Sequence, residues 1–428
     1  MFSMRISISA IVAFSALATA LLAQYPSPET RAQDALRLVL DRKYEQFYAL
    51  LSPEMKKAIS LQTYSAQVDQ IMAALGKSTG QGAPQSTTVQ GSVLVTIPVH
   101  WPAATLNFLV SWNKDGQIQG TWFRPGDAPK PAKYDSPPYS DPSAFTARDL
   151  NAGDLPGTLA IPRGKGRPFP ALVLVHGSGP NDRDETVGGA RPFRDLAEGL
   201  ASRGIAVLRY DKRTFVKNPG ALPKDGITMT WETVDDAVRA AEVLRSQPDI
   251  DPKRIFVLGH SQGGYMVPRI VKADPKLAGA IVLAGNARPL PALVAEQTEY
   301  LAELQGSLSA DQRARVEAVK KDPWSALPGI PESYKRDLDA YDPVALVRTS
   351  SVPLLILQGQ RDYQITMTDF GLWKKGLAGR ANTDFRSFPN LNHLFVAGEG
   401  KSTPAEYERT AHVDAEVVDA IVAWIKAQ

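Results

Sequence analysis

Residues 254–264 read RIFVLGHSQGG, an apolar run that leads into two glycines flanking a serine. The run is typical of a buried strand, and the residues after Gly264 have helical spacing, so a Gly-x-Ser-x-Gly motif stands between a predicted strand and a predicted helix. A side chain at Gly259 or Gly263 would collide with the neighbouring strand or helix. The sharp turn lifts the Ser261 hydroxyl clear of the sheet and directs the first helix amides at it. We therefore predict Ser261 as a nucleophile and the Gln262 amide as an oxyanion donor.

A serine nucleophile needs a base, and the chain has five histidines. His100 lies far upstream of the motif and has no visible partner. His176 and His260 flank glycines at strand ends, where we expect them to support the loops, and His412 begins the last predicted helix. His393 lies in the loop before that helix and downstream of the serine. In the chain order that accompanies this motif, the base occupies that position. The sequence therefore predicts His393 as the base.

The acid that orients the base is predicted from residues 354–362, LLILQGQRD. This segment reads as a buried strand that ends in a glycine turn, so Asp362 lies just beyond the strand and upstream of His393. The alternative acid position, after the preceding strand, holds Asn286, which cannot supply a charge. The expected triad is Ser261, Asp362 and His393, in that order.

A second oxyanion donor is expected from residues 173–180, VLVHGSGP, in which a strand ends in a His-Gly loop. The amide of Ser178 is the expected donor, and that of Gly177 is the alternative. Charged residues follow nearby, and we expect them to brace loops rather than to line a pocket: Asp182, Arg183, Asp184, Asp211 and Arg213.

Strand and helix patterns alternate from residue 143 to the end of the chain, which predicts a mostly parallel sheet with helices on both faces. The strands are expected near 155–162, 171–176, 205–208, 255–258, 280–284 and 354–357, and the helices near 192–203, 231–247, 262–273 and 410–426. Residues 289–341 interrupt the alternation and are interpreted as a helical cap over the carboxyl edge of the sheet. Its Tyr300, Trp324 and Tyr334 are expected either to line a pocket or to pack the cap onto the sheet.

Residues 27–125 have a different pattern and are expected to form a small α+β domain. Helical spacing covers 30–52 and 61–75, and strand patterns follow at 87–98, 104–112 and 117–124. This region is similar to nuclear-transport-factor-like or cystatin-like domains, and we interpret it as an appendage without chemistry of its own. Residues 126–142 are rich in proline and read as a linker.

The first 23 residues are typical of an export signal. Arg5 is followed by an uncharged apolar run, and small residues allow cleavage after Ala20 or Ala23. The alternative is an uncleaved membrane anchor. The chain has 428 residues and no cysteine, so it has no disulfides, no thiolate metal site and no need for oxidative folding. This agrees with a secreted or periplasmic protein that has no membrane span after signal cleavage.

Charge and composition exclude several classes of protein. With 43% hydrophobic and 22% charged residues the chain is globular. Its net charge is only +3 and no basic tract is present, so we expect no nucleic-acid partner. No metal-ligand cluster and no phosphate-binding loop is visible, so we expect neither a metal nor a cofactor. The sequence carries no signal for an oligomeric state.

Residues 145–428 resemble the α/β-hydrolase superfamily, with the closest likeness to esterase-like members of the dienelactone hydrolase and prolyl-oligopeptidase-like groups. The resemblance is carried by four stretches: LPGTL at 155–159, HGSGPNDRDE at 176–185, AVLRYDKR at 206–213 and the motif around Ser261. It implies an α/β-hydrolase fold and a serine hydrolase without cofactor, in which Ser261, Asp362 and His393 have the triad roles.

The expected function is hydrolysis of a small carboxylic ester through an acyl-enzyme. The alternative is an exopeptidase or amidase that uses the same triad, and an ester is favoured because its leaving group needs less help than an amine. A binding protein on a hydrolase scaffold is a third possibility, against which the intact triad argues. A dehalogenase is disfavoured, because its turn would carry aspartate where Ser261 stands.

Overall fold

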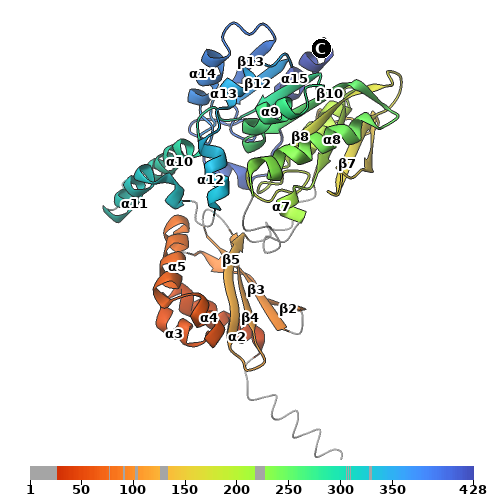
Figure 1. Ribbon diagram of the computed structural model, residues 1–428. Helices are drawn as coiled ribbons and strands as arrows, with labels where there is room; N and C mark the ends of the chain where they lie inside the picture. Colours follow the sequence, from red (N-terminus) through yellow and green to blue (C-terminus); the bar gives the residue numbers. More distant parts are fainter. Residues whose placement is uncertain are drawn as a thin grey trace, which may run out of the picture. The chain divides into compact units, whose positions relative to one another are not determined.

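The protein forms two compact units, Met1–Pro131 and Ala132–Gln428, each with its own sheet (Figure 1). The computed structural model describes residues 27–76, 78–89, 92–101, 105–125, 134–216, 227–304, 306, 308, 310–326 and 330–428. The expected export signal and residues 126–133 of the expected linker lie outside these ranges.

In the described part of the first unit, four helices pack against an antiparallel sheet. The helices are α2 (Pro28–Leu40), α3 (Tyr44–Ala49), α4 (Pro53–Ala58) and α5 (Leu61–Leu75), and the strands are β1 (Gly80–Gln81), β2 (Gln85–Val89), β3 (Ser92–His100), β4 (Thr105–Trp112) and β5 (Ile118–Pro125). Leu36 and Val39 of α2 are fully buried in one core with Val95 and Ile97 of β3. The expected single helix over 30–52 divides at Arg42, where a φ of 58° ends the helical path.

The second unit is built on an eight-stranded sheet with the order β13-β12-β11-β10-β8-β9-β7-β6. Its strands are β6 (Phe145–Asp149), β7 (Gly157–Pro162), β8 (Phe169–Val175), β9 (Ala206–Tyr210), β10 (Ile250–His260), β11 (Gly279–Leu283), β12 (Leu354–Gly359) and β13 (Thr383–Phe388). β7 pairs in antiparallel fashion with β6 and with β9. The other neighbouring strands of this sheet pair in parallel. The prediction of a mostly parallel sheet is confirmed.

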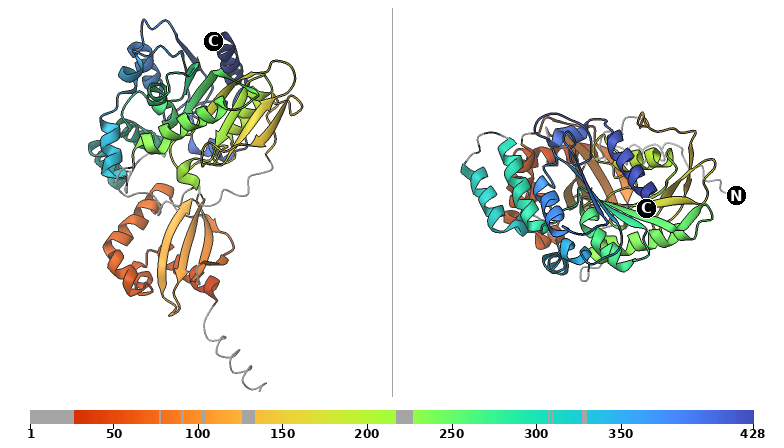
Figure 2. Two further views of the ribbon diagram at one scale, coloured as in Figure 1. Left: turned by 45° about the vertical axis from the view of Figure 1, so that its right-hand side comes forward. Right: turned by 90° about the horizontal axis from the view of Figure 1, so that it is seen from above.

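Helices cover both faces of this sheet (Figure 2). Successive side chains of a strand point to opposite faces, so each central strand contributes to the core on both sides. Val173 and Val175 of β8 belong to the core under α8 (Asp235–Arg245) and α9 (Gln262–Ala273). Leu172 and Leu174 belong to the core under α6 (Pro192–Ala201) and α15 (Ala415–Ala427). The continuous apolar run of β8 is therefore explained by burial on both sides.

A helical insertion follows β11 and ends before β12. It contains α10 (Leu290–Leu304), α11 (Ala310–Lys321), the short helix η3 (Pro323–Ala326), α12 (Glu332–Asp339) and α13 (Pro343–Val347). The remaining elements of the unit are α7 (Arg213–Val216), the π-helix η2 (Thr230–Val234), α14 (Met367–Gly376) and η4 (Pro404–Glu408). Since ligands bind beyond the carboxyl ends of parallel strands, this insertion is placed to shape a site.

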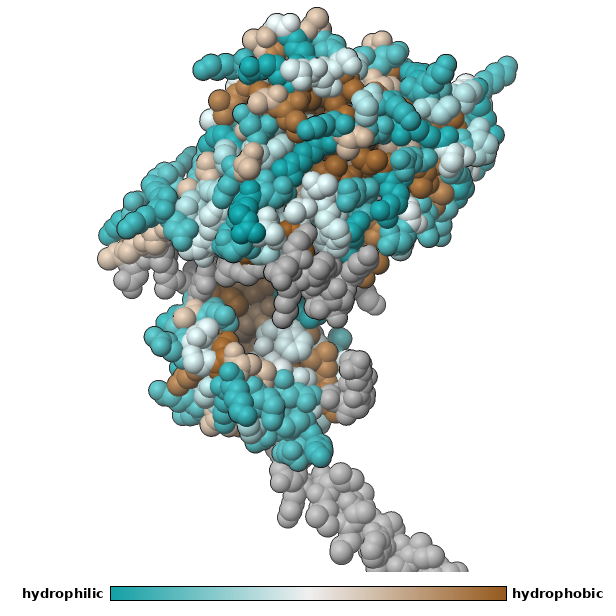
Figure 3. Space-filling model, in the orientation of Figure 1, coloured by the Kyte–Doolittle hydropathy of each residue, from teal (hydrophilic) through white to brown (hydrophobic). Residues whose placement is uncertain are grey.

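The surface drawn in Figure 3 is mostly hydrophilic, with hydrophobic residues in separate patches. Among the large apolar side chains, Phe215 is 53% exposed, at the end of α7. No described helix has the length and apolar character that a membrane crossing requires.

Candidate active site

The turn after β10 holds Ser261 in a backbone conformation that few residues adopt. Its φ is 52°, and it caps the N-terminus of α9. The Ser261 amide donates to the carbonyl of Leu283 over 2.9 Å, which ties the turn to the end of β11. A Cβ at Gly259 would overlap the backbone of Gly263, and a Cβ at Gly263 would overlap the carbonyl of Val175. Both glycines are thus required by close backbone approach.

Asp362 and His393 come from separate loops and meet in the structure. His393 Nδ1 lies 2.7 Å from Asp362 Oδ2, and both side chains are buried. The other carboxylate oxygen of Asp362 accepts the amides of Gln364 (2.8 Å) and Ile365 (3.0 Å). These bonds fix the carboxylate as an acceptor. His393 therefore carries its proton on Nδ1 and presents Nε2 as the nitrogen that can accept one.

A second acid–histidine pair lies behind the first and ties it to the serine turn. His260, the residue before Ser261, donates from Nε2 to the carbonyl oxygen of His393 over 3.0 Å. Its Nδ1 lies 2.9 Å from Glu185 Oε2. Burial is the largest single influence on each group and opposes its charge. The attraction between the two groups and the hydrogen bonds around them together outweigh burial, so the pKa of His260 is raised and that of Glu185 is lowered. His260 therefore faces a carboxylate with Nδ1 and a carbonyl oxygen with Nε2, and both contacts favour its charged form.

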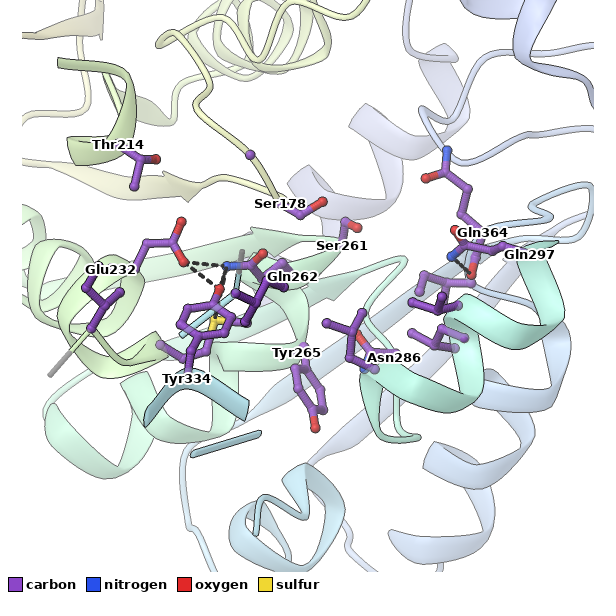
Figure 4. A pocket seen from close by; sticks show the side chains of 18 of the residues that line it. Ser178, Thr214, Glu232, Ser261, Gln262, Tyr265, Asn286, Gln297, Tyr334 and Gln364 are labelled. Carbon is purple, nitrogen blue, oxygen red and sulfur yellow. Dashed lines mark hydrogen bonds between the residues drawn. The ribbon is translucent and has the colours of Figure 1, made fainter. Parts of the chain in front are cut away.

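The His-Gly loop after β8 passes beside the serine. A Cβ at Gly177 would lie 3.2 Å from the Cβ of Ser261. The Gly177 amide donates to Glu185 Oε1 over 2.6 Å, so it is already engaged. Ser178 lines the same cavity as Ser261 and Gln262 (Figure 4). Of the two amides expected from this loop, that of Gly177 is therefore engaged by Glu185, while Ser178 lies at the cavity.

The serine opens onto a cavity of about 410 Å³. Apolar side chains from the insertion, from the segment before α8 and from the loop after β12 form most of its wall: Ile227, Met229, Leu290, Leu293, Val294, Ile330, Pro331 and Ile365. Of the three cap aromatics considered above, Tyr334 lines this cavity. Tyr300 instead stacks on Tyr363, with ring centroids 4.9 Å apart, and Trp324 packs against the hydrophobic core.

A polar cluster closes one side of the cavity (Figure 4). Glu232 Oε2 accepts the hydroxyl of Tyr334 (2.6 Å) and the side-chain amide of Gln262 (3.2 Å), while Oε1 lies 3.0 Å from Lys212 Nζ. Burial alone would raise the pKa of Glu232, but Lys212 and the two hydrogen bonds lower it, so the group is a carboxylate. Sequence analysis did not single out Glu185, Lys212 or Glu232, although two of the stretches quoted for the resemblance contain Glu185 and Lys212.

The other charged residues near the loop brace it, as expected. Arg183 binds the carboxylate of Asp211 at 2.8 and 3.0 Å, and Arg213 binds that of Asp236 at 2.7 Å. His176 lies beneath the loop, where burial lowers its pKa to about 4 and keeps it neutral. In the described part of the chain no group of three or more His, Asp or Glu side chains is arranged to hold a metal ion.

The chain is similar to known hydrolases. Residues 172–411 match the family model described as "Alpha/beta hydrolase family". Over 400 residues the chain is 36% identical to esterase EstD of Thermotoga maritima, which covers 92% of this chain and 95% of that protein. It is 27% identical over 214 residues to acyl-coenzyme A thioesterase 1 of Mus musculus, covering 50% and 45% of the two chains. A solved esterase of Pyrococcus furiosus covers 66% of this chain and 90% of its own, with a TM-score of 0.42 and 16% identity.

Proposed function

We propose, since the chain belongs to the alpha/beta hydrolase family and is therefore a hydrolase, that it is a serine esterase acting through an acyl-enzyme on Ser261. The observation that carries the proposal is the 2.7 Å contact between His393 Nδ1 and Asp362 Oδ2. This pair is tied to the serine turn by His260, the residue before Ser261, which donates to the His393 carbonyl over 3.0 Å. In this assignment Ser261 is the nucleophile, His393 the base and Asp362 the acid that orients it, and the amides of Ser178 and Gln262 are assigned to the oxyanion hole.

The reaction follows from these positions. Ser261 Oγ attacks the acyl carbon while His393 Nε2 takes its proton, and the substrate oxygen becomes an oxyanion that the two amides stabilise. The bond to the leaving oxygen then breaks, and His393 returns the proton to the alcohol. Water attacks the acyl-enzyme with His393 again as base, which releases the carboxylic acid and restores Ser261. Asp362 stabilises the imidazolium in both halves of the cycle.

Ester substrates are favoured over peptides by the polar groups of the cavity. An exopeptidase that binds the free amino end of its substrate needs an available carboxylate. Glu232 lies on the cavity wall, but its charge is already balanced by Lys212 at 3.0 Å. The rest of the wall is mainly apolar, which suits an acyl chain or an alcohol without charge. The name of the relative from Thermotoga maritima, an esterase, supports the same choice.

We further propose that the enzyme is exported. The support is the sequence of residues 1–23, a single arginine followed by an apolar run and small residues. The protein is recovered from the periplasm or from the culture medium, and its intact mass should show cleavage after Ala20 or Ala23. Retention of the full N-terminus in membranes would favour the anchor alternative.

The proposal is tested by the Ser261→Ala variant. It should fold normally but lose labelling by a fluorophosphonate and, by analogy with other triads, on the order of 10⁴- to 10⁶-fold in kcat. Ser246→Ala, at the end of α8, is the matched control and should keep both. Assays with p-nitrophenyl esters beside aminoacyl p-nitroanilides separate the two substrate classes. Persistent labelling of folded Ser261→Ala would refute the nucleophile, and faster turnover of the anilides would favour the peptidase.

A further inference from the structure

Lys212 lies buried beneath the loop that carries Ser178. Only 2% of the residue is exposed, and it comes two positions after the end of β9. Its Nζ donates to the carbonyl oxygen of Gly177 over 2.8 Å and lies 3.0 Å from Glu232 Oε1. A buried ammonium group costs several kcal/mol unless it is paired and hydrogen-bonded, so its place under this loop calls for an explanation.

The carbonyl that Lys212 binds belongs to the same peptide unit as the Ser178 amide. In a planar trans peptide the C=O and N–H bonds point in opposite directions, so a donor that fixes the oxygen also fixes the direction of the N–H. A charged donor makes a stronger bond than a neutral one, and it draws electrons toward the oxygen, which strengthens the N–H as a donor on the other side. Lys212 is therefore placed to act on the oxyanion hole without touching the substrate.

From this arrangement we infer that Lys212 is a positioning residue of the oxyanion hole: its ammonium group orients and polarises the Gly177–Ser178 peptide so that the Ser178 amide stabilises the oxyanion. The inference rests on the proposed function, in which Ser178 supplies one of the two amides. It deepens that function, because it assigns a role in transition-state stabilisation to a residue outside the triad.

Glu232 completes the arrangement on the other side of the site. It holds Lys212 through one carboxylate oxygen and the Gln262 side chain through the other, at 3.0 and 3.2 Å. Gln262 supplies the second amide of the proposed oxyanion hole. One buried ion pair thus contacts the carbonyl of the Gly177–Ser178 peptide through Lys212 and the side chain of Gln262 through Glu232.

Asn181 offers a comparison within the same loop. Its side-chain amide also donates to the Gly177 carbonyl, at 3.2 Å, but it is neutral. If simple occupancy of the carbonyl were sufficient, Asn181 would compensate for the loss of Lys212. If the charge matters, it would not, and a neutral replacement at position 212 would remain impaired.

The test uses the full-length enzyme and the variants Lys212→Met, Lys212→Gln and Lys212→Arg. The measurements are kcat and KM on p-nitrophenyl butyrate and the inhibition constant of a phenylboronic acid, whose adduct with serine is tetrahedral. We expect Lys212→Met to lower kcat roughly 10- to 100-fold, below the loss for removal of a whole oxyanion donor, with KM changed less than about threefold. Boronate affinity should fall by a similar factor, and Lys212→Arg should recover part of both.

Controls separate this effect from stability. Arg245→Met breaks another buried pair, with Asp274 at 2.6 Å, at the far end of α8 and α9, and should lower stability without changing kcat or boronate affinity. If Lys212→Met does not fold, Lys212→Gln must show the same loss of kcat, since it keeps a donor but not the charge.

One outcome would overturn the role of Lys212, and a different outcome would overturn the proposed function on which that role rests. A folded Lys212→Met or Lys212→Gln variant with wild-type kcat and boronate affinity would show that the pair is structural only. A wild-type enzyme that is not labelled at Ser261 would overturn the proposed function instead.

Discussion

Two carboxylate–histidine pairs lie within the site, and the second nitrogen of each histidine decides what the pair can do. His393 contacts Asp362 through Nδ1, which leaves Nε2 for the role of base that we propose for this residue. His260 faces Glu185 through Nδ1 and donates from Nε2 to the His393 carbonyl, so neither nitrogen can accept. Only the first pair can serve as a base. The second pair holds the backbone that carries the first.

The role of Asp362 is tested by Asp362→Asn. Asparagine would turn an amide toward Nδ1 and stabilise the wrong tautomer of His393, so kcat should fall on the order of 10⁴-fold with little change in KM. The fold should persist, because the asparagine oxygen can still accept the amides of Gln364 and Ile365. Circular dichroism and steady-state kinetics check both points. Near-normal activity would mean that another carboxylate orients the base.

The charge of the Glu185–His260 pair is tested by Glu185→Gln. Glutamine can still accept the Gly177 amide and can donate to a neutral His260, so the variant should fold. It should nevertheless be less stable, because removing one partner of a buried pair costs up to about 3–5 kcal/mol. The raised pKa of His260 gives stability that is full below its unfolded value of 6.5 and is lost as the pH rises through the folded value. The lowered pKa of Glu185 gives stability that is full above 4.5 and is lost as the pH falls through its folded value.

The difference in unfolding free energy between wild type and Glu185→Gln should therefore be largest between pH 4.5 and 6.5 and should shrink on both sides. Urea unfolding at pH 5.5, 7.5 and 9 measures it. A difference that does not vary with pH would show that the two groups are not an ion pair in the folded protein.

At the scale of elements, α10 contributes one face to the cavity. Leu290, Leu293, Val294 and Gln297 all line it, and their spacing of three and four residues places them on the same side of the helix. Ala292, on the same helix, is exposed. The helix thus separates the cavity from solvent, and its inner side chains set how much of the substrate the cavity can hold.

A larger side chain on this face should shorten the preferred acyl chain. Val294→Trp would fill part of the 410 Å³ cavity, so kcat/KM for p-nitrophenyl octanoate should fall at least about tenfold relative to the acetate. Ala292→Trp, on the exposed face of the same helix, is the control and should leave the ratio unchanged. A ratio that does not move in folded Val294→Trp would place the acyl chain elsewhere.

At the scale of the whole molecule, the boundary of the second unit lies earlier than the proline pattern alone suggests. Tyr134 donates to Asp195 of α6 over 2.8 Å, and Tyr139 donates to the carbonyl of Val413 over 2.7 Å. Residues 134–142, the end of the expected linker, therefore pack against the catalytic unit. A cut at Asp141 would remove both tyrosines and leave two buried acceptors with fewer donors.

Fragments that begin at Ala132 and at Asp141 test this boundary. The longer fragment should keep kcat/KM for p-nitrophenyl acetate within about threefold of the full chain, because the unit has its own core and complete site. The shorter fragment should be less stable by roughly 2–4 kcal/mol from the two lost hydrogen bonds. Thermal unfolding and kinetics compare them. A folded but inactive fragment from Ala132 would mean that the first unit contributes to catalysis.

The sequence by itself determined the central strands and the order of the site residues. The strands β8 to β12 are buried on both faces, so they appear as continuous apolar runs, and the turn after β10 tolerates only glycine at two positions. The edge strands β6 and β13 were not predicted. Their side chains are largely exposed or alternate in exposure, so Phe145–Asp149 and Thr383–Phe388 have little apolar content to mark them.

Only the tertiary structure decided which residues surround the predicted ones. Glu185, Lys212 and Glu232 lie on three different segments, and no local period or spacing relates them to Ser261. Their contacts arise because the carboxyl ends of parallel strands converge at one edge of the sheet. The bond between the Gly177 amide and Glu185, which supports Ser178 as the proposed oxyanion donor, likewise joins residues that no spacing in the sequence relates. Buried charges find their partners through tertiary packing between distant segments, and local spacing in the sequence does not predict that pairing.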